Sequence, residues 1–141
     1  MKLYFAGPLF TTAERVWNAE VTAALRAAGH EVFLPQEREP GKDARGIFAT
    51  DVGGIDWADG IVAIMEGADP DSGTSWEAGY AYGKGKPSVL VRTDFRALAG
   101  EAGEYNPMLA EAATVRLDLP AASTTEVASA VLAALERIGA R

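Results

Sequence analysis

The fold is decided by an apolar run, Gly60-Ile61-Val62-Ala63-Ile64-Met65, and by the segments that follow it, Glu66-Gly67-Ala68-Asp69-Pro70 and Asp71-Ser72-Gly73-Thr74-Ser75-Trp76-Glu77-Ala78-Gly79-Tyr80-Ala81. We interpret them as a strand, a loop and the start of a helix. In an open α/β sheet such loops lie at the carboxyl ends of the strands, where ligands bind. The small residues at the helix start let a ligand approach the backbone and its free N–H groups.

The same order of strand and helix recurs about five times along the chain. Further strands are predicted at residues 3–6, 31–34, 88–91 and 114–117. A helix that opens at Thr11 and ends at Gly29 would bury Trp17, Val21, Ala24, Leu25 and Ala28. A terminal helix would bury Val127, Val131, Leu132, Leu135 and Ile138. This order predicts an α/β fold, a flavodoxin-like three-layer sandwich with a five-stranded parallel sheet, in one domain over residues 1–141.

Another helix is predicted over residues 44–58, although it contains two glycines. Its buried side would consist of Ile47, Phe48, Val52 and Ile55. We expect Asp56 to be solvated and Asp59 to orient the turn into the strand at Gly60. His30 follows a helix-ending glycine, so it is interpreted as a solvated turn residue without chemistry.

Composition excludes several classes of protein. With no cysteine and a single histidine, the chain offers no disulfide, no thiolate metal site and no histidine cluster for zinc. The net charge of −7 opposes binding to nucleic acid, whereas an uncharged nucleoside meets no such barrier. No apolar stretch approaches the length of about 18 residues that a membrane span needs, and residues 1–4 lead straight into a strand, so we expect no membrane association and a cytoplasmic protein. Residues 79–84 lack the spacing of a phosphate-binding loop, and no cofactor is expected.

The residues alone admit two interpretations of Glu77. Thr74-Ser75-Trp76-Glu77 has the pattern of a capping box, in which Glu77 would bind the backbone of Thr74. Alternatively, Glu77 and Asp71 are two carboxylates that flank a loop suited to a ligand, and Glu77 is a reactive group.

Four segments, in order, resemble the nucleoside 2-deoxyribosyltransferase family. The run from Asp71 to Ala81 resembles its active-site segment, in which the glutamate at the Glu77 position is the nucleophile. Residues 4–10 are similar to its first strand and loop, and residues 51–59 to its central aspartate segment. Asn106-Pro107-Met108 resembles its inter-subunit motif that contacts the sugar, so the likeness spans most of the chain.

This resemblance implies a role for each residue of a site. Glu77 would be the nucleophile, Tyr4 would orient it, and Asp51, near the base, is assigned as the acid that protonates the departing base. The substrate-binding residues would be Asp71 and Asn106 at the sugar hydroxyls, Phe10 and Met108 at flat apolar faces, Gly7 and Gly73 in the loops, and Gln36, whose amide can face a nucleobase edge. Without the resemblance, an asparagine before a proline is an ordinary turn opener.

The implied reaction is transfer of a 2-deoxyribosyl group between nucleobases through a covalent glycosyl-glutamate intermediate, with slow hydrolysis as a side reaction. Its partners would be a deoxynucleoside and a free nucleobase. Two alternatives stay open: a hydrolase that acts on 2-deoxynucleoside 5′-monophosphates, whose phosphate Asp71 would repel, and a non-catalytic nucleoside-binding module in which Glu77 only caps a helix. The acidic stretch at residues 100–105, which we expect to be flexible, could cross to a neighbouring subunit, and the family places the motif at Asn106 in a neighbour's pocket. The resemblance therefore implies a homo-oligomer, a dimer or a hexamer, with active sites shared between subunits.

Overall fold

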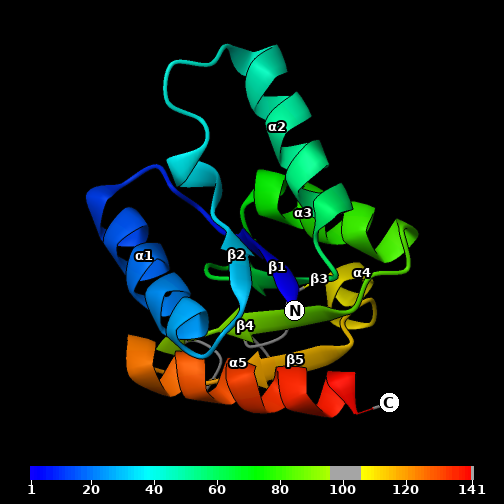
Figure 1. The fold of residues 1–141 in the computed structure, drawn as a ribbon. Helices are drawn as coiled ribbons and strands as arrows, with labels where there is room; N and C mark the ends of the chain where they lie inside the picture. Colours follow the sequence, from blue (N-terminus) through cyan, green and yellow to red (C-terminus); the bar gives the residue numbers. More distant parts are fainter. Residues whose placement is uncertain (96–105, 141) are drawn as a thin grey trace.

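A five-stranded parallel sheet forms the centre of the molecule (Figure 1). The computed structural model describes residues 1–95 and 106–140. The strands have the order β2-β1-β3-β4-β5, and they are β1 (Lys2–Ala6), β2 (Glu31–Phe33), β3 (Gly60–Ile64), β4 (Ser88–Arg92) and β5 (Val115–Asp118). This order is that of flavodoxin-like folds, so the predicted fold class is confirmed.

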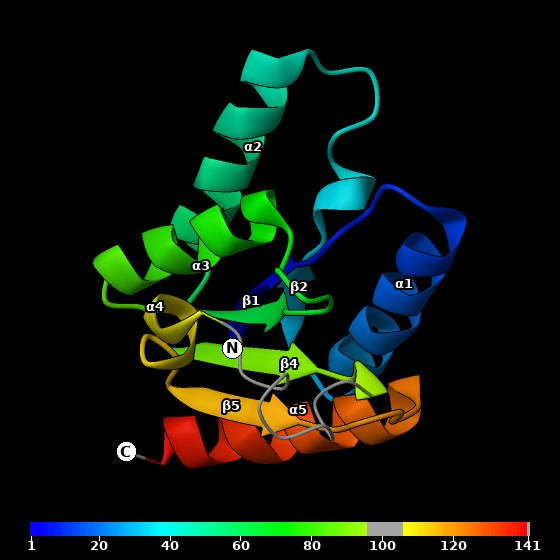
Figure 2. The same cartoon turned by 180° about the vertical axis from the view of Figure 1, so that it is seen from behind.

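Helices cover both faces of the sheet (Figures 1 and 2). One face carries α1 (Thr12–Ala27) and α5 (Thr124–Gly139), which pack on alternate strand residues such as Leu3, Phe5 and Val62. The other face carries α2 (Ala44–Trp57), α3 (Ser72–Gly83) and the short α4 (Pro107–Ala110), which pack on Tyr4, Ile61 and Leu90. Because side chains alternate along a strand, the two sets form separate hydrophobic cores. No helix in the described part of the chain is long and apolar enough to cross a membrane.

Helix α1 begins where predicted, with a capping box formed by Thr11 and Glu14. The predicted apolar face is only partly right, because Ala28 is exposed and the polar Asn18 and Thr22 are buried in the helix. The Asn18 side chain donates to the carbonyl of Pro8 at 2.9 Å, so it fixes the loop after β1. His30 lies in the turn before β2, as predicted, but it is half-buried rather than solvated.

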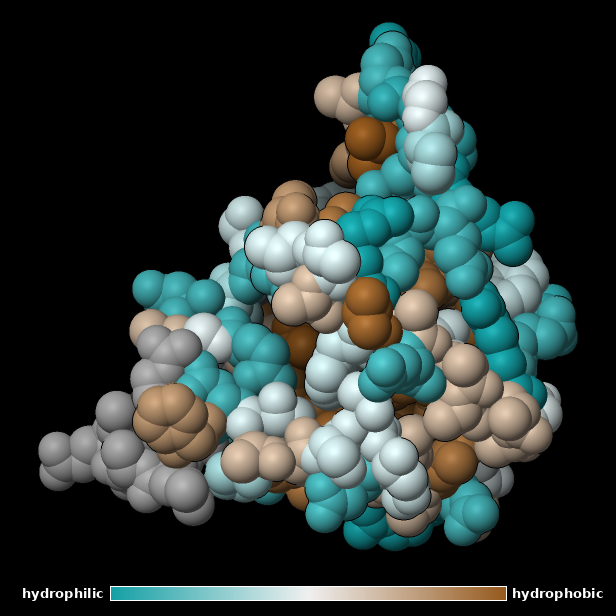
Figure 3. All heavy atoms as spheres, turned by 90° about the vertical axis from the view of Figure 1, so that its left-hand side faces the viewer, coloured by the Kyte–Doolittle hydropathy of each residue, from teal (hydrophilic) through white to brown (hydrophobic). Residues whose placement is uncertain are grey.

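Helix α2 touches the sheet at only one of its ends. A Cβ at Gly54 would lie 2.8 Å from the Phe33 ring, so this glycine lets the helix approach β2 closely. Ile55 is buried as predicted, but Phe48 is 57% exposed, and its predicted burial is wrong. The reason is geometric: the first half of the helix projects beyond the sheet, as Figures 1 and 3 show.

Candidate active site

A hollow of about 260 Å³ opens at the carboxyl ends of β1 and β3. These two strands lie where the strand order reverses, which is the usual place for a ligand in an open α/β sheet. The side chains and backbone of four segments meet there: the loop after β1, the loop before α2, α2 itself and the start of α3. The lining residues are Gly7, Leu9, Phe10, Glu39, Ile47, Asp51, Asp71, Gly73, Thr74 and Glu77.

The start of α3 shows that Glu77 is not a capping residue. The cap is Asp71, whose Oδ2 accepts hydrogen bonds from Thr74 N at 2.9 Å and Thr74 Oγ1 at 3.1 Å. The helix therefore begins at Ser72, and Glu77 lies in its second turn. The capping-box interpretation is wrong because a better-placed carboxylate already satisfies the N–H groups of the first turn.

Tyr4 binds Glu77 from the centre of the sheet. Its hydroxyl donates to Glu77 Oε1 at 2.5 Å. The Tyr4 side chain is fully buried in β1 and stacks on the Phe33 ring of β2, with 5.4 Å between ring centroids. Burial and the negative charge of Glu77 both raise the Tyr4 pKa above its ordinary value, so the hydroxyl keeps its proton. Two packed strands thus fix the donor that orients Glu77.

The carboxyl groups of Glu77 and Asp51 both hold protons more tightly than usual. Burial is the largest cause for Glu77, and with the charges of Asp51, Asp71 and Glu39 it raises the pKa to about 8, against the hydrogen bond from Tyr4. For Asp51, burial and then the nearby Glu39 raise the pKa to about 7, although Lys42 and Tyr4 oppose the rise. Since these groups interact, the protons belong to the set of carboxyls rather than to one residue.

Asp71, Gly7 and Gly73 lie where a sugar could approach Glu77. Asp71 lines the hollow, but one of its oxygens is occupied as the cap of α3. A Cβ at Gly73 would lie 3.1 Å from that oxygen, and a Cβ at Gly7 would lie 3.2 Å from Ile64. A side chain at either position would therefore crowd its neighbours in the protein. Phe10, 75% exposed, lies at the mouth of the hollow.

Three of the predicted substrate-binding residues do not line this hollow. The Gln36 amide donates to the carbonyl of Arg15 at 2.9 Å and accepts from Asn18 at 3.4 Å, so it ties its loop to α1. Asn106 caps α4 by accepting from Met108 N at 2.9 Å. Met108 is 80% exposed, and α4 packs on α3 and on the hydrophobic core that contains Tyr4. The acidic stretch before Asn106 lies outside the described residues.

Glu39 lines the hollow and was missed by sequence reasoning. The signal was present, because the loop from Gln36 to Asp43 is conspicuously polar. What the sequence does not reveal is the single 3-10 turn at Pro35–Glu37, which directs Gln36 toward α1 and leaves Glu39 to face Asp51.

A neighbouring hollow of about 320 Å³ runs between α2 and α3. It shares Ile47, Asp51, Gly73 and Glu77 with the first hollow, so the two carboxyl groups lie at the boundary between them. Exposed aromatic rings form its outer wall: Phe48 packs on Trp76 with 5.5 Å between ring centroids. Both hollows thus offer apolar surface beside the same two acids.

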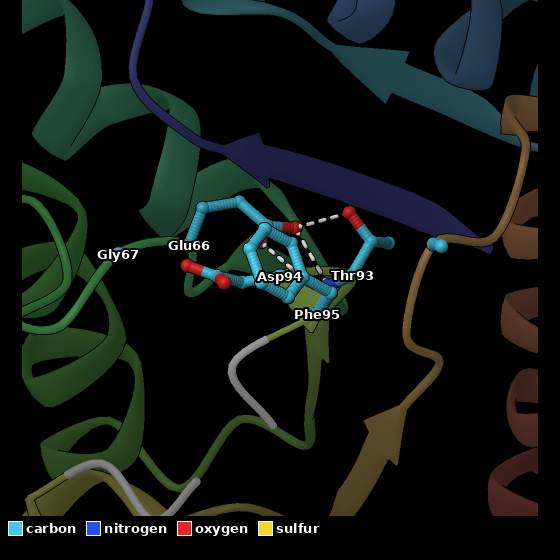
Figure 4. A pocket seen from close by; sticks show the side chains of 6 residues that line it. Glu66, Gly67, Thr93, Asp94 and Phe95 are labelled. Carbon is cyan, nitrogen blue, oxygen red and sulfur yellow. Dashed lines mark hydrogen bonds between the residues drawn. The ribbon is translucent and has the colours of Figure 1, made fainter. Parts of the chain in front are cut away.

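A larger hollow, about 560 Å³, lies at the ends of β3 and β4 (Figure 4). Its carboxylate, Glu66, accepts hydrogen bonds from Thr93 N, Thr93 Oγ1 and Asp94 N at 2.7–2.8 Å. A carboxylate with that many donors is held in place rather than activated. The smaller hollow around Glu77 is therefore the better candidate for the active site, although the hollow at Glu66 is larger.

No group of three histidine, cysteine, aspartate or glutamate side chains within residues 1–95 and 106–140 is arranged to hold a metal ion.

Comparison with known proteins identifies a family. The family described as nucleoside 2-deoxyribosyltransferase matches residues 3–132. It is a family of enzymes that act on N-glycosidic bonds. We found no significant match to this sequence among curated proteins.

Solved structures with the same fold include a 2-deoxyribosyltransferase from Bacillus psychrosaccharolyticus, 27% identical, with a TM-score of 0.73 over 91% of this chain and 90% of that one. A conserved protein from Enterococcus faecalis V583 is also 27% identical, with a TM-score of 0.73 over 92% of this chain and 95% of that one. A CMP N-glycosidase from Clostridium botulinum is 18% identical and shares the fold, with a TM-score of 0.67 over 93% of this chain and 97% of that one.

Proposed function

This chain belongs to the nucleoside 2-deoxyribosyltransferase family, and on that premise we propose that it transfers a 2-deoxyribosyl group between nucleobases through a covalent intermediate on Glu77. The observation that carries this proposal is the hydrogen bond of 2.5 Å between Tyr4 and Glu77, beside a second carboxyl group that holds a proton near neutral pH. A nucleophile and an acid in one hollow are the two groups that a glycosidic bond requires.

In the first step Glu77 attacks C1′ of the sugar from the face opposite the base. Tyr4 binds Oε1, so we assign the attack to Oε2. The new C1′–O bond forms as the C1′–N bond breaks, and the electron pair of that bond leaves with the base. Glu77 attacks in its ionised form while Asp51 keeps its proton, and the positive charge that develops on the sugar stabilises the ionised form of Glu77.

Asp51 supplies the proton that the departing base needs. A base that leaves with an extra electron pair is a poor leaving group until a ring nitrogen is protonated, and an acid with a pKa of about 7 is suited to that transfer near neutral pH. When a second base enters, Asp51 takes back a proton, and the base attacks C1′ and releases Glu77. Two displacements retain the configuration at C1′.

The charge of the hollow favours a nucleoside over a nucleoside 5′-monophosphate. Four of its lining residues are acidic, namely Glu39, Asp51, Asp71 and Glu77. Of the hydroxyls at the start of α3, Thr74 Oγ1 already donates to Asp71 Oδ2 and Ser75 Oγ donates to Asp71 O. A phosphate would meet negative charge and, of the three hydroxyls at the start of α3, only that of Ser72 without a hydrogen bond of this kind. We therefore propose a transferase that acts on nucleosides, with the nucleotide hydrolase as the second candidate.

We also propose that a neighbouring subunit completes the site. Asn106 and Met108 are exposed and lie outside the hollow of their own chain, so they are available to another copy. Mixing Glu77→Gln subunits with Asn106→Ala subunits, after dissociation and reassembly, should regenerate sites in which both residues are intact. If mixed assemblies form and stay as inactive as their parents, the shared-site proposal fails.

The proposed function is tested with deoxyinosine and free adenine, followed by chromatography. The expected products are deoxyadenosine and hypoxanthine. Hypoxanthine with free deoxyribose would instead identify a hydrolase, and two unchanged reactants would identify a binding module. The Glu77→Gln variant is the control, because it keeps the shape of the side chain and removes the nucleophile.

A further inference from the structure

Glu39 reaches the hollow from the loop that precedes α2. The end of that loop is fixed, because Asp43 caps α2 by accepting from Gly46 N at 2.8 Å. The carboxyl groups of Glu39 and Asp51 line the same hollow, and the interaction with Glu39 is one cause of the raised pKa of Asp51. Asp51 also interacts with Tyr4 and Glu77, so Glu39 belongs to the same group of interacting side chains.

Two carboxyl groups can share a hydrogen bond only if one of them holds a proton. The charged and titratable groups that act on Asp51 are Glu39, Lys42, Tyr4 and Glu77. Glu39 and Glu77 are acids, Tyr4 carries a neutral hydroxyl, and Lys42 is a cation. When a base enters the hollow and this proton turns from the shared hydrogen bond toward the base, the pair of Glu39 and Asp51 presents one O–H donor and one carboxylate acceptor.

Asp51 must reach a ring nitrogen of the nucleobase if it is to protonate the leaving group. Glu39, which lines the same hollow and interacts with Asp51, then faces the neighbouring position on the same edge of the base. Adjacent ring-nitrogen and exocyclic positions are close enough for one amide side chain to bind both. The apolar side chains of Leu9, Phe10 and Ile47 line the same hollow and can hold the flat faces of the base.

We propose that the Glu39–Asp51 pair selects nucleobases that carry an amino group beside a ring nitrogen, as adenine and cytosine do, over bases with an oxo group at that position. The inference rests on the proposed function and names the substrate class of the same site. The Asp51 O–H donates to the ring nitrogen, and the Glu39 carboxylate accepts an N–H from the amino group. An oxo base would direct oxygen lone pairs at the Glu39 carboxylate, which repels them.

The test compares deoxyadenosine with deoxyinosine, which differ at the 6-position of the purine and have the same sugar. In a two-displacement reaction kcat/KM for the donor reports only formation of the glycosyl-enzyme, so one saturating acceptor, 2,6-diaminopurine, serves for both donors. The two bases differ in intrinsic leaving ability. The informative quantity is therefore the change in the ratio of the two kcat/KM values between wild type and variant, in which that difference cancels.

Glu39→Gln is the informative variant, because its amide can turn an N–H donor toward an oxo group. We expect it to lower the ratio of deoxyadenosine to deoxyinosine by roughly 10-fold to 100-fold, the discrimination typical of one paired base edge. The matched control is Glu37→Gln, on the same loop, whose carboxylate is paired with Arg26 at 2.8 Å outside the hollow. It should leave the ratio unchanged. A ratio that Glu39→Gln does not alter overturns the proposal.

A second measurement separates this inference from the proposed function. Calorimetric titration of Glu77→Gln with each nucleoside reports selectivity without turnover. If wild type consumes no donor, the transferase proposal fails. The selectivity is still supported if Glu77→Gln binds deoxyadenosine more tightly than deoxyinosine and if adding Glu39→Gln abolishes that difference. Equal binding of the two nucleosides by the protein with Glu39 intact contradicts it.

Discussion

Two glutamates lie near the carboxyl end of β3: Glu66 follows the strand, and Glu77 lies in α3. Their surroundings differ in the number of hydrogen-bond donors. Glu66 accepts three hydrogen bonds, two on Oε1 and one on Oε2, from the backbone and hydroxyl groups that follow β4 (Figure 4). Glu77 accepts one, from Tyr4, and otherwise lies near Asp51, Asp71 and Glu39. The first carboxylate joins two loops of the fold, whereas the second is held by one donor among like charges.

This difference shows what makes a carboxylate reactive in this fold. Donors stabilise the negative charge of a carboxylate and reduce its tendency to form a bond, while burial among other acids has the opposite effect. The pKa of Glu77, about 8, records that effect. Perturbed acids in a hollow are also what functional sites typically contain. The number of donors around each glutamate, rather than its exposure, therefore separates a structural role from a catalytic one.

The largest expected effect is on turnover. Glu77→Gln should lower kcat by on the order of 10⁴-fold or more, because the amide cannot form the glycosyl-enzyme. Glu66→Gln should stay within about 10-fold of wild type, since Glu66 does not line the hollow around Glu77. Initial rates of base exchange measure both. Similar losses in the two variants would contradict the assignment of different roles.

Asp51→Asn should produce the next largest effect, about 10²-fold to 10⁴-fold, because it removes a general acid. Wild-type kcat/KM should show a bell-shaped pH dependence with limbs set by the interacting acids, whose pKa values are about 7 and about 8. The variant should lose the alkaline limb, since that limb reports loss of the proton. The Asp51→Asn variant should lose less activity on nucleosides that have an activated leaving base. Equal losses for activated and unactivated bases would assign Asp51 to binding instead.

In stability the order of the two glutamates should reverse. Glu66→Ala leaves the N–H groups of Thr93 and Asp94 without their carboxylate and should cost about 2–4 kcal/mol of unfolding free energy. Glu77→Gln removes a buried acid from a group of acids and should cost less than about 1 kcal/mol at pH 8. Urea unfolding followed by circular dichroism measures both. A more damaging Glu77→Gln would show that its contact with Tyr4 is chiefly structural.

The last expected effect is a pH dependence of stability to which Glu77 contributes. The folded protein raises the pKa of Glu77 from 4.5 to about 8, so the folded state binds this proton more tightly than the unfolded state does. Its contribution to stability is fully present below the ordinary value and is lost as the pH rises toward 8. The slope of unfolding free energy against pH between 5 and 8 should become less negative in Glu77→Gln. An unchanged slope would mean that Glu77 is not the group that titrates.

The order of strands and helices could be predicted from the sequence because apolar runs of strand length alternate with helical periodicity. The start of α3 could not be predicted, because Asp71 and Thr74 are both of residue types that cap helices and lie three positions apart. Only the path of the chain shows that Asp71 is the cap. Burial of Phe48 was predicted wrongly because periodicity gives the face of a helix but not how far the helix extends past the sheet. Glu39 was missed because its direction depends on one turn of 3-10 helix.

Phe33 contacts the elements that hold both of the proposed catalytic acids, Glu77 and Asp51. One face of its ring stacks on Tyr4, which holds Glu77, and the ring also abuts Gly54 of α2, three positions after Asp51. Substitutions at positions 4, 33 and 54 therefore cannot act independently. In a mutational scan these three core positions should show epistasis, and a change in the ring at 33 should alter which residues positions 4 and 54 tolerate. Laboratory evolution of activity would then select substitutions in the hydrophobic core of the sheet, because these change the positions of Glu77 and Asp51.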